Sequence, residues 1–245
     1  MGLALRAFSR LDRAILIPGL GADLQRYRDW TVLRRNGPAG ALHDASIASM
    51  RESVRLVSVL EASKRALVLG ASQSAADVNE DVARRADVDI ARRRSGGSAV
   101  LVGPGEVVWV DVFVPAGDVL FQPDISKAAR WLGGLWAKAI GASAMVWDGP
   151  MSHSPWSKVV CFAGLGPGEV TLGGRKVVGI SQRRTQSGAL FQSAALLNWD
   201  PGLHAALLRK PEEAKLGQLT GVACGLGKPL GEHLAAAFVR LLLDE

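Results

Sequence analysis

The chain has 245 residues, of which 48% are hydrophobic and 21% are charged, and these values are typical of a folded globular protein. They exclude a disordered chain, a collagen and a coiled coil, and no apolar run approaches the roughly 20 residues of a membrane span. The net charge of +6 favours acidic partners without selecting one class of them. Two cysteines cannot form a disulfide framework, and charges interrupt the first 20 residues, so we expect a cytoplasmic protein without a signal peptide.

The first half of the chain alternates between helices and short strands. The predicted elements are a helix over 42–60, a strand over 66–69, a helix over 74–86, and two strands over 98–102 and 106–114. Apolar residues such as Leu42, Ile47 and Met50 recur at helical spacing and predict the first helix. Gly103-Pro104-Gly105 separates the last two strands, and because these are turn residues we expect the strands to form a hairpin.

The second half begins with an amphipathic helix and continues with strands. The predicted elements are a helix over 125–140, strands over 145–147, 159–162, 169–172, 176–182 and 187–197, and helices over 201–208, 212–219 and 230–243. The pair Gly173-Gly174 predicts a second tight turn. Hairpins in the middle with helices early and late predict an α+β fold, in which a mixed, largely antiparallel central sheet is flanked by helices.

A basic segment that ends in two glycines is the first candidate site. It reads Arg92-Arg93-Arg94-Ser95-Gly96-Gly97, directly before a predicted strand. Glycines let the backbone approach a ligand closely, and adjacent guanidinium groups can bind phosphate or carboxylate. A solvated basic turn explains the same residues about equally well.

The second candidate site is the segment around Lys176. It reads Gly173-Gly174-Arg175-Lys176, followed by an apolar strand that runs to Gln182. A lysine at the start of such a strand can pack its stem and direct its ammonium into a cleft. Taken alone, the segment is better explained as a hairpin with Arg175 and Lys176 exposed.

Taken together, four segments resemble the lipoate–protein ligase A family, within the biotin and lipoate ligase and octanoyltransferase superfamily. The matching segments are, in the family's order, Gly70-Ala71-Ser72-Gln73, then Asn79, then Ala91 to Val100 with Arg-Arg-Arg-Ser-Gly-Gly, and then Gly174-Arg175-Lys176-Val177-Val178-Gly179-Ile180-Ser181-Gln182. The resemblance is firm over residues 66–198. It implies the catalytic-domain fold of these ligases, formed here by residues 1–245 as a single domain without a C-terminal accessory domain.

The resemblance also implies a reaction. Members of the family activate lipoate or octanoate with ATP and Mg²⁺ to an acyl-adenylate, and then transfer the acyl group to a lysine of a lipoyl domain. Lys176 corresponds to the family's essential lysine, which stabilises negative charge on the reacting phosphate. The implied substrate- or nucleotide-binding residues are Arg93, Ser95, Gly96, Gly97, Gln73, Asn79, Gly179 and Gln182. No metal centre and no tightly bound cofactor is implied.

The implied partners are small acidic proteins. They are the apo lipoyl domains of 2-oxoacid dehydrogenases or the glycine cleavage H protein, with acyl carrier protein as a further candidate. Nucleic acid and membrane are not expected as partners. The chain departs from the family pattern where Leu101-Val102 replaces His-Asp and where Gln192-Ser193 replaces His-Gly. These departures bear on whether the chain forms an adenylate by itself.

Cys161 supports a competing interpretation. The pair Cys161-Phe162 lies fifteen positions before Lys176 and is similar to the Cys-Phe of octanoyltransferases, in which the cysteine carries the acyl group. A small buried residue is the ordinary explanation, and we expect Cys161 to face the core. The sequence therefore leaves three functions open: an ATP-dependent ligase, which we favour, a thiol octanoyltransferase, and an acyl-binding relative without catalysis.

Overall fold

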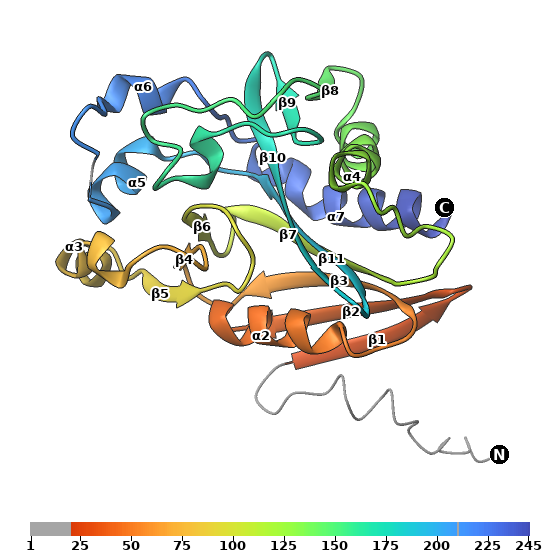
Figure 1. Cartoon of the computed structure of the whole chain (residues 1–245). Helices are drawn as coiled ribbons and strands as arrows, with labels where there is room; N and C mark the ends of the chain where they lie inside the picture. Colours follow the sequence, from red (N-terminus) through yellow and green to blue (C-terminus); the bar gives the residue numbers. More distant parts are fainter. Residues whose placement is uncertain (1–20, 210) are drawn as a thin grey trace.

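The computed structural model describes residues 21–209 and 211–245, which form two β-sheets and the helices around them (Figure 1). The larger sheet has the order β1-β2-β3-β7-β11-β10-β9-β8, and the smaller has the order β5-β4-β6. Only the pairs β2–β3 and β4–β5 are parallel within the described residues. The expected mixed, largely antiparallel sheet is therefore confirmed.

The strands of the larger sheet are β1 (Gly21–Tyr27), β2 (Trp30–Gly37), β3 (Arg55–Ala62), β7 (Val107–Pro115), β8 (Ala144–Val146), β9 (Val170–Leu172), β10 (Arg175–Thr185) and β11 (Gly188–Leu196). Those of the smaller sheet are β4 (Ala66–Leu69), β5 (Asp89–Arg92) and β6 (Val100–Val102). The helices are α2 (Ala39–Ser49), α3 (Glu80–Arg85), α4 (Ile125–Ile140), α5 (Pro201–Leu207), α6 (Leu216–Thr220) and α7 (Lys228–Leu243), with short 3-10 turns η1 (Ala75–Asp77) and η2 (Cys161–Ala163).

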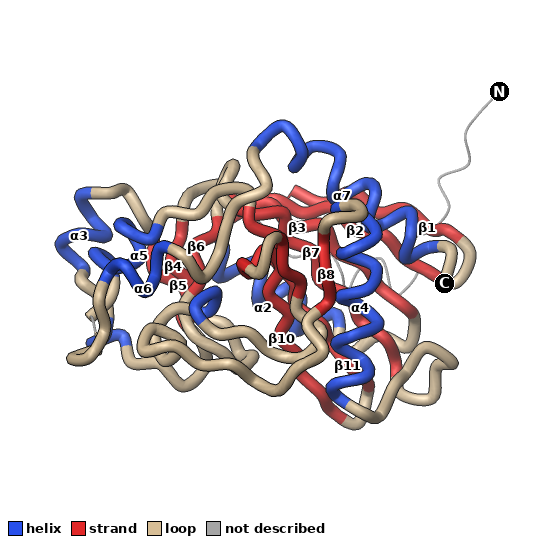
Figure 2. Tube along the Cα trace, turned by 90° about the horizontal axis from the view of Figure 1, so that it is seen from above, coloured by secondary structure: helices blue, strands red, loops and turns tan. Residues whose placement is uncertain are grey.

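Helices cover the two faces of the larger sheet (Figures 1 and 2). On one face α4 packs beside α7, and Trp136 stacks on Phe238 with ring centroids 4.2 Å apart. On the other face lie α2 and the smaller sheet. Val110 and Val112 of β7 pack toward α4 and α7, whereas Trp109 packs toward α2. Burial on both faces therefore explains why residues 107–115 are apolar except for Asp111.

The helix predicted over 42–60 is wrong in its second half. Helix α2 ends at Ser49, and residues 55–62 form β3 between β2 and β7. Within β3, Val57 packs on the α4 and α7 face, while Leu56 and Leu60 pack on the opposite face. Because both faces are apolar, the sequence lacks the alternation that distinguishes a strand from a buried helix.

The hairpin predicted at Gly103-Pro104-Gly105 is also wrong. Strand β6 pairs with β4 in the smaller sheet, and β7 pairs with β3 and β11 in the larger one. At Gly103 the backbone has φ +149°, and an added Cβ would lie 2.8 Å from the Cα of Arg65. The glycine is thus needed where the chain passes from one sheet to the other at close contact.

Two further predicted elements differ in form. The helix predicted over 74–86 is divided into η1 and α3, because Asn79 leaves the helical conformation and caps α3 by accepting a hydrogen bond from the Val82 amide at 3.3 Å. The strand predicted over 159–162 is a single bridge at Val160 followed by η2. The helix over 125–140 and the strand over 66–69 are confirmed.

In the described part of the chain no helix is long and apolar enough to cross a membrane. The first 20 residues, over which no signal peptide is predicted, lie outside the described residues.

Candidate active site

The three adjacent arginines are held in three different ways. The side chain of Arg92 donates to the backbone carbonyls of the preceding turn, residues 70–73. Arg93 is buried, and its Nη2 donates to the carbonyl of Ser98 at 2.9 Å. Arg94 is exposed. Only Arg93 therefore points into the protein, while Arg92 fixes the loop that precedes it.

Residues 93–98, here called the glycine loop, lie against the turn at Gly70. A Cβ on Gly70 would come within 1.7 Å of the Gly97 carbonyl oxygen. Gly97 has φ +94°, and its added Cβ would lie 2.5 Å from Nη2 of Arg93. Gly96 has no atom within 4 Å of its added Cβ. Packing therefore requires glycine at positions 70 and 97. The backbone at Gly96, in contrast, is open.

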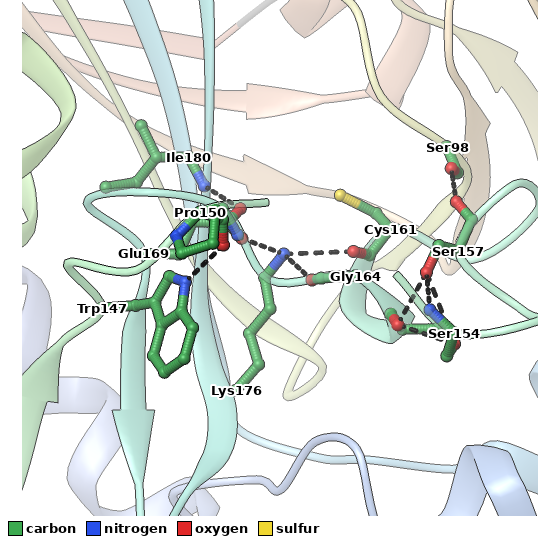
Figure 3. A network of polar contacts seen from close by, with 12 residues as sticks. Ser98, Trp147, Pro150, Ser154, Ser157, Cys161, Gly164, Glu169, Lys176 and Ile180 are labelled. Atoms are coloured by element: carbon green, nitrogen blue, oxygen red, sulfur yellow. Dashed lines mark hydrogen bonds and ion pairs between the residues drawn. The ribbon is translucent and has the colours of Figure 1, made fainter. Parts of the chain in front are cut away.

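Lys176 is buried, with 3% of its surface exposed, and its ammonium has three partners (Figure 3). Nζ donates to the carbonyls of Gly164 at 2.8 Å and Cys161 at 3.1 Å, and it lies 2.7 Å from Oε2 of Glu169. The same carboxylate oxygen accepts from the Gly166 amide at 2.7 Å. The interpretation of Lys176 as an exposed hairpin residue is therefore corrected.

The backbone around Lys176 explains why a lysine can be buried here. A β-bulge follows it in β10, and its amide donates to the carbonyl of Val222 at 2.9 Å. Gly179 leaves room for the side chain, because an added Cβ there would lie 3.5 Å from Lys176 Cε and 3.3 Å from Phe162 Cζ. The ammonium lies 5.1 Å from the centroid of the Phe162 ring. These contacts fix the ammonium between Phe162 and the carbonyls of η2.

The glycine loop and Lys176 line one cleft, although some eighty residues separate them in sequence. The lining residues are Arg93, Gly96, Gly97, Ser98, Met151, His153, Ser157, Cys161, Gly164, Glu169, Lys176, Ile180, Ser181 and Gln182. An adjoining hollow extends to the start of α4 and shares four lining residues with the cleft: Met151, Glu169, Ile180 and Gln182. The structure thus brings the two candidate segments together.

Cys161 does not face the core, contrary to the sequence-based expectation. It is half-buried and lines the cleft, and its Sγ lies 3.8 Å from Nη2 of Arg93. The Cys161 amide donates to the Ala99 carbonyl at 2.8 Å, which holds this residue against the glycine loop. Its neighbours Val160 and Phe162 take the buried positions instead. Lys176 reaches the carbonyl of Cys161 and not its thiol (Figure 3).

Of the other candidate residues, Gln182 and Ser95 lie at or beneath the cleft. Gln182 lines it, and its Nε2 donates to the Ile125 carbonyl at 2.8 Å. Ser95 is buried below the loop, and its hydroxyl accepts from Ser181 at 3.3 Å. Gln182 thus connects β10 to α4, and Ser95 connects the loop to β10.

Gln73 and Asn79 do not line the cleft. Gln73 accepts from the Gly70 amide at 2.9 Å and donates to the Val159 carbonyl at 3.2 Å, so its contacts hold the turn before the loop. Asn79 caps α3. The hydrogen bonds of both side chains described here are made to backbone groups of the protein.

A second cavity, here called the inner cavity, adjoins the cleft at Cys161. It shares Arg93, Cys161, Ile180 and Ser181 with the cleft. Its other lining residues are His43, Val100, Val102, Trp109, Phe162, Gly179, Gln192, Ser193 and Ala194. The cavity therefore extends inward from the cleft between β6 of the smaller sheet and β7, β10 and β11 of the larger one.

Buried polar groups meet beside this cavity. Gln192 Nε2 lies 3.1 Å from His43 Nδ1 and donates to Asp111 Oδ2 at 3.0 Å, and Trp109 Nε1 donates to Asp111 Oδ1 at 2.7 Å. Burial raises the pKa of Asp111 to about 6, and the hydrogen bonds it accepts offset this effect only in part. Burial, together with the charge of Arg93, lowers the pKa of His43 to about 3. His43 lies in α2 and Asp111 in β7, so they can be recognised as a buried polar cluster only from the folded structure.

Comparison with known proteins defines the class to which this fold and cleft belong. Residues 39–229 match the family described as the lipoyl protein ligase A/B catalytic domain. The chain therefore belongs to the lipoyl protein ligase A/B family. No curated protein sequence is significantly similar to it.

Solved structures of lipoate–protein ligases share the fold. A lipoate–protein ligase A bound with ATP has 18% identity and a TM-score of 0.64, over 86% of this chain and 84% of that one. A proposed lipoate protein ligase of T. acidophilum with bound lipoic acid has 16% identity and a TM-score of 0.61, over 87% and 84%. A bipartite lipoate protein ligase of Thermoplasma acidophilum, studied with its E2 lipoyl domain, has 16% identity and a TM-score of 0.61, over 84% and 81%.

Proposed function

We propose that this protein is a lipoate–protein ligase-like enzyme. It activates lipoate or octanoate with ATP to an acyl-adenylate and transfers the acyl group to a lysine of a lipoyl domain. The observation that carries the proposal is the buried ammonium of Lys176 in the same cleft as the open backbone of Gly96. Membership of the family supports it, as do the solved relatives with bound lipoic acid and bound ATP.

The first step forms a mixed anhydride. An oxygen of the acid's carboxylate attacks the α-phosphorus of ATP, a P–O bond to pyrophosphate breaks, and negative charge builds on the α-phosphate oxygens. Lys176 supplies a fixed positive charge for those oxygens, and Glu169 holds its ammonium in place. To bind a phosphate oxygen, the ammonium exchanges the carbonyl of Gly164 or Cys161 for it.

The second step transfers the acyl group. The neutral amine of the acceptor lysine attacks the acyl carbonyl, an amide bond forms as the nitrogen loses a proton to solvent, and AMP leaves with the bonding electrons of the anhydride. The acyl chain occupies the inner cavity, whose wall is largely apolar. The adjoining hollow beside the start of α4 offers room for the rest of the nucleotide, which enters with Mg²⁺ as part of the substrate.

The acceptor in this proposal is an apo lipoyl domain of a 2-oxoacid dehydrogenase or the glycine cleavage H protein. The net charge of +6 favours an acidic protein of this kind. A relative that works with an E2 lipoyl domain supports the same assignment.

A second candidate function is favoured by the position of Cys161. Its thiol lines the cleft beside Arg93, a guanidinium that can hold the oxygen of an acyl group. In a thiol octanoyltransferase, Sγ attacks the carbonyl of an octanoyl thioester, the carrier thiol leaves and takes a proton, and the acyl group remains on Cys161. That reaction needs no ATP.

One experiment separates these functions. The purified protein is incubated with a lipoyl domain and either octanoate with MgATP or octanoyl-acyl carrier protein without ATP, and the products are weighed by intact-protein mass spectrometry. The ligase proposal predicts transfer only with MgATP, together with pyrophosphate exchange. An octanoyl adduct that forms without ATP and disappears in Cys161→Ala would instead establish the octanoyltransferase.

A further inference from the structure

Two small residues and one large one lie side by side along the inner cavity, on three neighbouring strands. Gly179 of β10 pairs with Ala194 of β11, and Ala194 pairs with Trp109 of β7. Directly paired residues of antiparallel strands share one face of the sheet, and all three residues line the cavity. The row of three therefore offers little side-chain volume on β10 and β11 and an indole ring on β7.

The row starts beside the groups that face the carboxyl end of the acid in the proposed function. An added Cβ on Gly179 would lie 3.5 Å from Lys176 Cε. Cys161 lines both the cleft and the inner cavity, so the two spaces adjoin at this end of the row. With its carboxyl end toward Lys176, an acyl chain in the inner cavity extends across β11 toward Trp109.

The indole of Trp109 is held firmly at the other end. The residue is buried, its Nε1 donates to Asp111 Oδ1 at 2.7 Å, and its ring centroid lies 4.4 Å from that of His43. Rotation of the indole would take a hydrogen bond from a buried carboxylate, which is costly. We therefore expect the ring to stay in place when a chain enters the cavity.

The spacing of the strands indicates the length of chain that fits. Neighbouring strands lie about 5 Å apart, so Gly179 and Trp109 are separated by about 10 Å. An extended polypeptide covers that distance with about three residues, or about nine chain atoms, and a saturated carbon chain has a similar zigzag form. Leu60, the partner of Trp109 on β3, is buried but is not a lining residue of the cavity. The space therefore suits about eight carbons and ends before β3.

We propose that Trp109 sets the upper limit of acyl-chain length in this protein. The substrate is an acid of about eight carbons, and a chain about four carbons longer, which would need one more strand spacing, collides with the indole. The inference rests on the proposed function for the position of the carboxyl end. It deepens that function because it names the residue that determines chain length.

Calorimetric titration of the full-length protein tests the limit without any catalytic step. Hexanoate, octanoate, decanoate and dodecanoate are compared below the concentrations at which they form micelles. We expect octanoate to bind at least about tenfold more tightly than dodecanoate, which corresponds to about 1.4 kcal/mol. Without a wall, burial of additional methylene groups would favour the longer acid. Dodecanoate that binds as tightly as octanoate would therefore overturn the proposal.

Trp109→Leu should move the limit outward. It keeps an apolar side chain on β7 and frees about one strand spacing, so dodecanoate should bind at least as tightly as octanoate. Trp136→Leu is the matched control, because Trp136 is also buried but packs against Phe238 on the opposite face of the sheet. The control should keep the preference for octanoate. A folded Trp109→Leu protein that still rejects dodecanoate would contradict the role of Trp109.

Ala194→Val tests the path of the chain and does not depend on the stability of the tryptophan variant. Its larger side chain narrows the cavity over β11, so octanoate should lose about tenfold in affinity relative to hexanoate. Ala195→Val, on the opposite face of the same strand, should leave the order of affinities unchanged. An unchanged order in Ala194→Val would show that the chain does not cross this row, and the proposal would fail.

The outcomes also separate this inference from the proposed function. If all four acids bind and are transferred to a lipoyl domain with MgATP regardless of their length, the inference alone is removed. If none of the acids binds, the proposed function falls together with it.

Discussion

The ammonium of Lys176 lies 2.7 Å from the carboxylate of Glu169, and both side chains are buried at the edge of the cleft. The carboxylate accepts two backbone amides, from Gly166 at 2.7 Å and Ile180 at 3.2 Å. Glu169 thus aligns the lysine with the cleft and is itself held by the chain on both sides. The Lys176–Glu169 pair therefore contributes both to the proposed chemistry of the cleft and to the stability of the fold.

Replacement of Lys176 by methionine should therefore affect both properties. It leaves Glu169 buried without a counter-charge, so we expect the free energy of unfolding to fall by about 3 kcal/mol or more. Acyl transfer should fall by about 10²–10³, as for other single contacts to a charged transition state. Urea unfolding and a transfer assay measure the two effects. Arg175→Met, at the exposed neighbouring position, should change stability by no more than about 0.5 kcal/mol.

The double variant Lys176→Met/Glu169→Gln provides the complementary test. Because it removes both charges, it should be less destabilised than the sum of the two single variants, by about 1–3 kcal/mol. Strictly additive losses would contradict the view that the two residues act as a pair.

The two glycines of the loop should respond differently to alanine. Gly97→Ala places a Cβ at positive φ and against Arg93, so we expect a loss of about 1–3 kcal/mol in the free energy of unfolding. Gly96→Ala meets no atom within 4 Å and should leave stability nearly unchanged. Denaturant unfolding of both variants checks this, and equal losses would argue against the packing described for Gly97.

The two cysteines should differ in their reactivity with iodoacetamide. Cys161 is half-buried in the cleft wall, whereas Cys224 is buried, and burial raises the pKa of the Cys224 thiol. Peptide mass spectrometry should therefore show alkylation of Cys161 first, and bound octanoate should slow it. Preferential labelling of Cys224, or no effect of octanoate, would speak against an acyl site beside Cys161.

Asp111 and His43 should give opposite contributions to the pH dependence of stability. The pKa of Asp111 is raised from 3.8 to about 6, so its contribution to the free energy of unfolding is present at low pH and is lost as pH rises through about 6. The pKa of His43 is lowered from 6.5 to about 3, so its contribution is present above 6.5 and is lost as pH falls toward 3. In the window between about 4 and 6 the two effects therefore oppose each other.

If one of these two groups is replaced, the pH dependence of stability that the other causes should become measurable. In Asp111→Asn the free energy of unfolding should rise with pH over that window, by up to about 1.4 kcal/mol per pH unit relative to the unmodified protein. In His43→Phe it should fall with pH by a similar amount. Urea titrations at several pH values measure both slopes. Slopes of the same sign in the two variants would contradict the assigned shifts.

The sequence predicts those parts of the site that local segments determine. The glycine loop and Lys176 each lie within a short contiguous motif, and both line the cleft. The orientation of Cys161 was not predictable, since it depends on pairing with Ala99, some sixty residues away in the chain. His43 and Gln192 belong to α2 and β11, so no local pattern connects them.

The same distinction holds for the fold. The helix over 125–140 has one apolar face and a capping aspartate, Asp124, and its bounds follow from these local features. Strand β3 is apolar on both faces because other layers cover it, and it therefore resembles a buried helix in sequence. The partner of β6 is likewise set by the second sheet and not by the turn at Gly103-Pro104-Gly105.

The inner cavity lies between the two sheets, with Val100 and Val102 on one side and Trp109 and Gln192 on the other. The cavity separates these residues of the two layers locally. An acyl chain that fills it becomes an interior component of the protein, in contact with both layers at once. If the proposed acyl site is correct, binding of the chain adds contacts to both sheets and raises the free energy of unfolding, and release of the product removes those contacts.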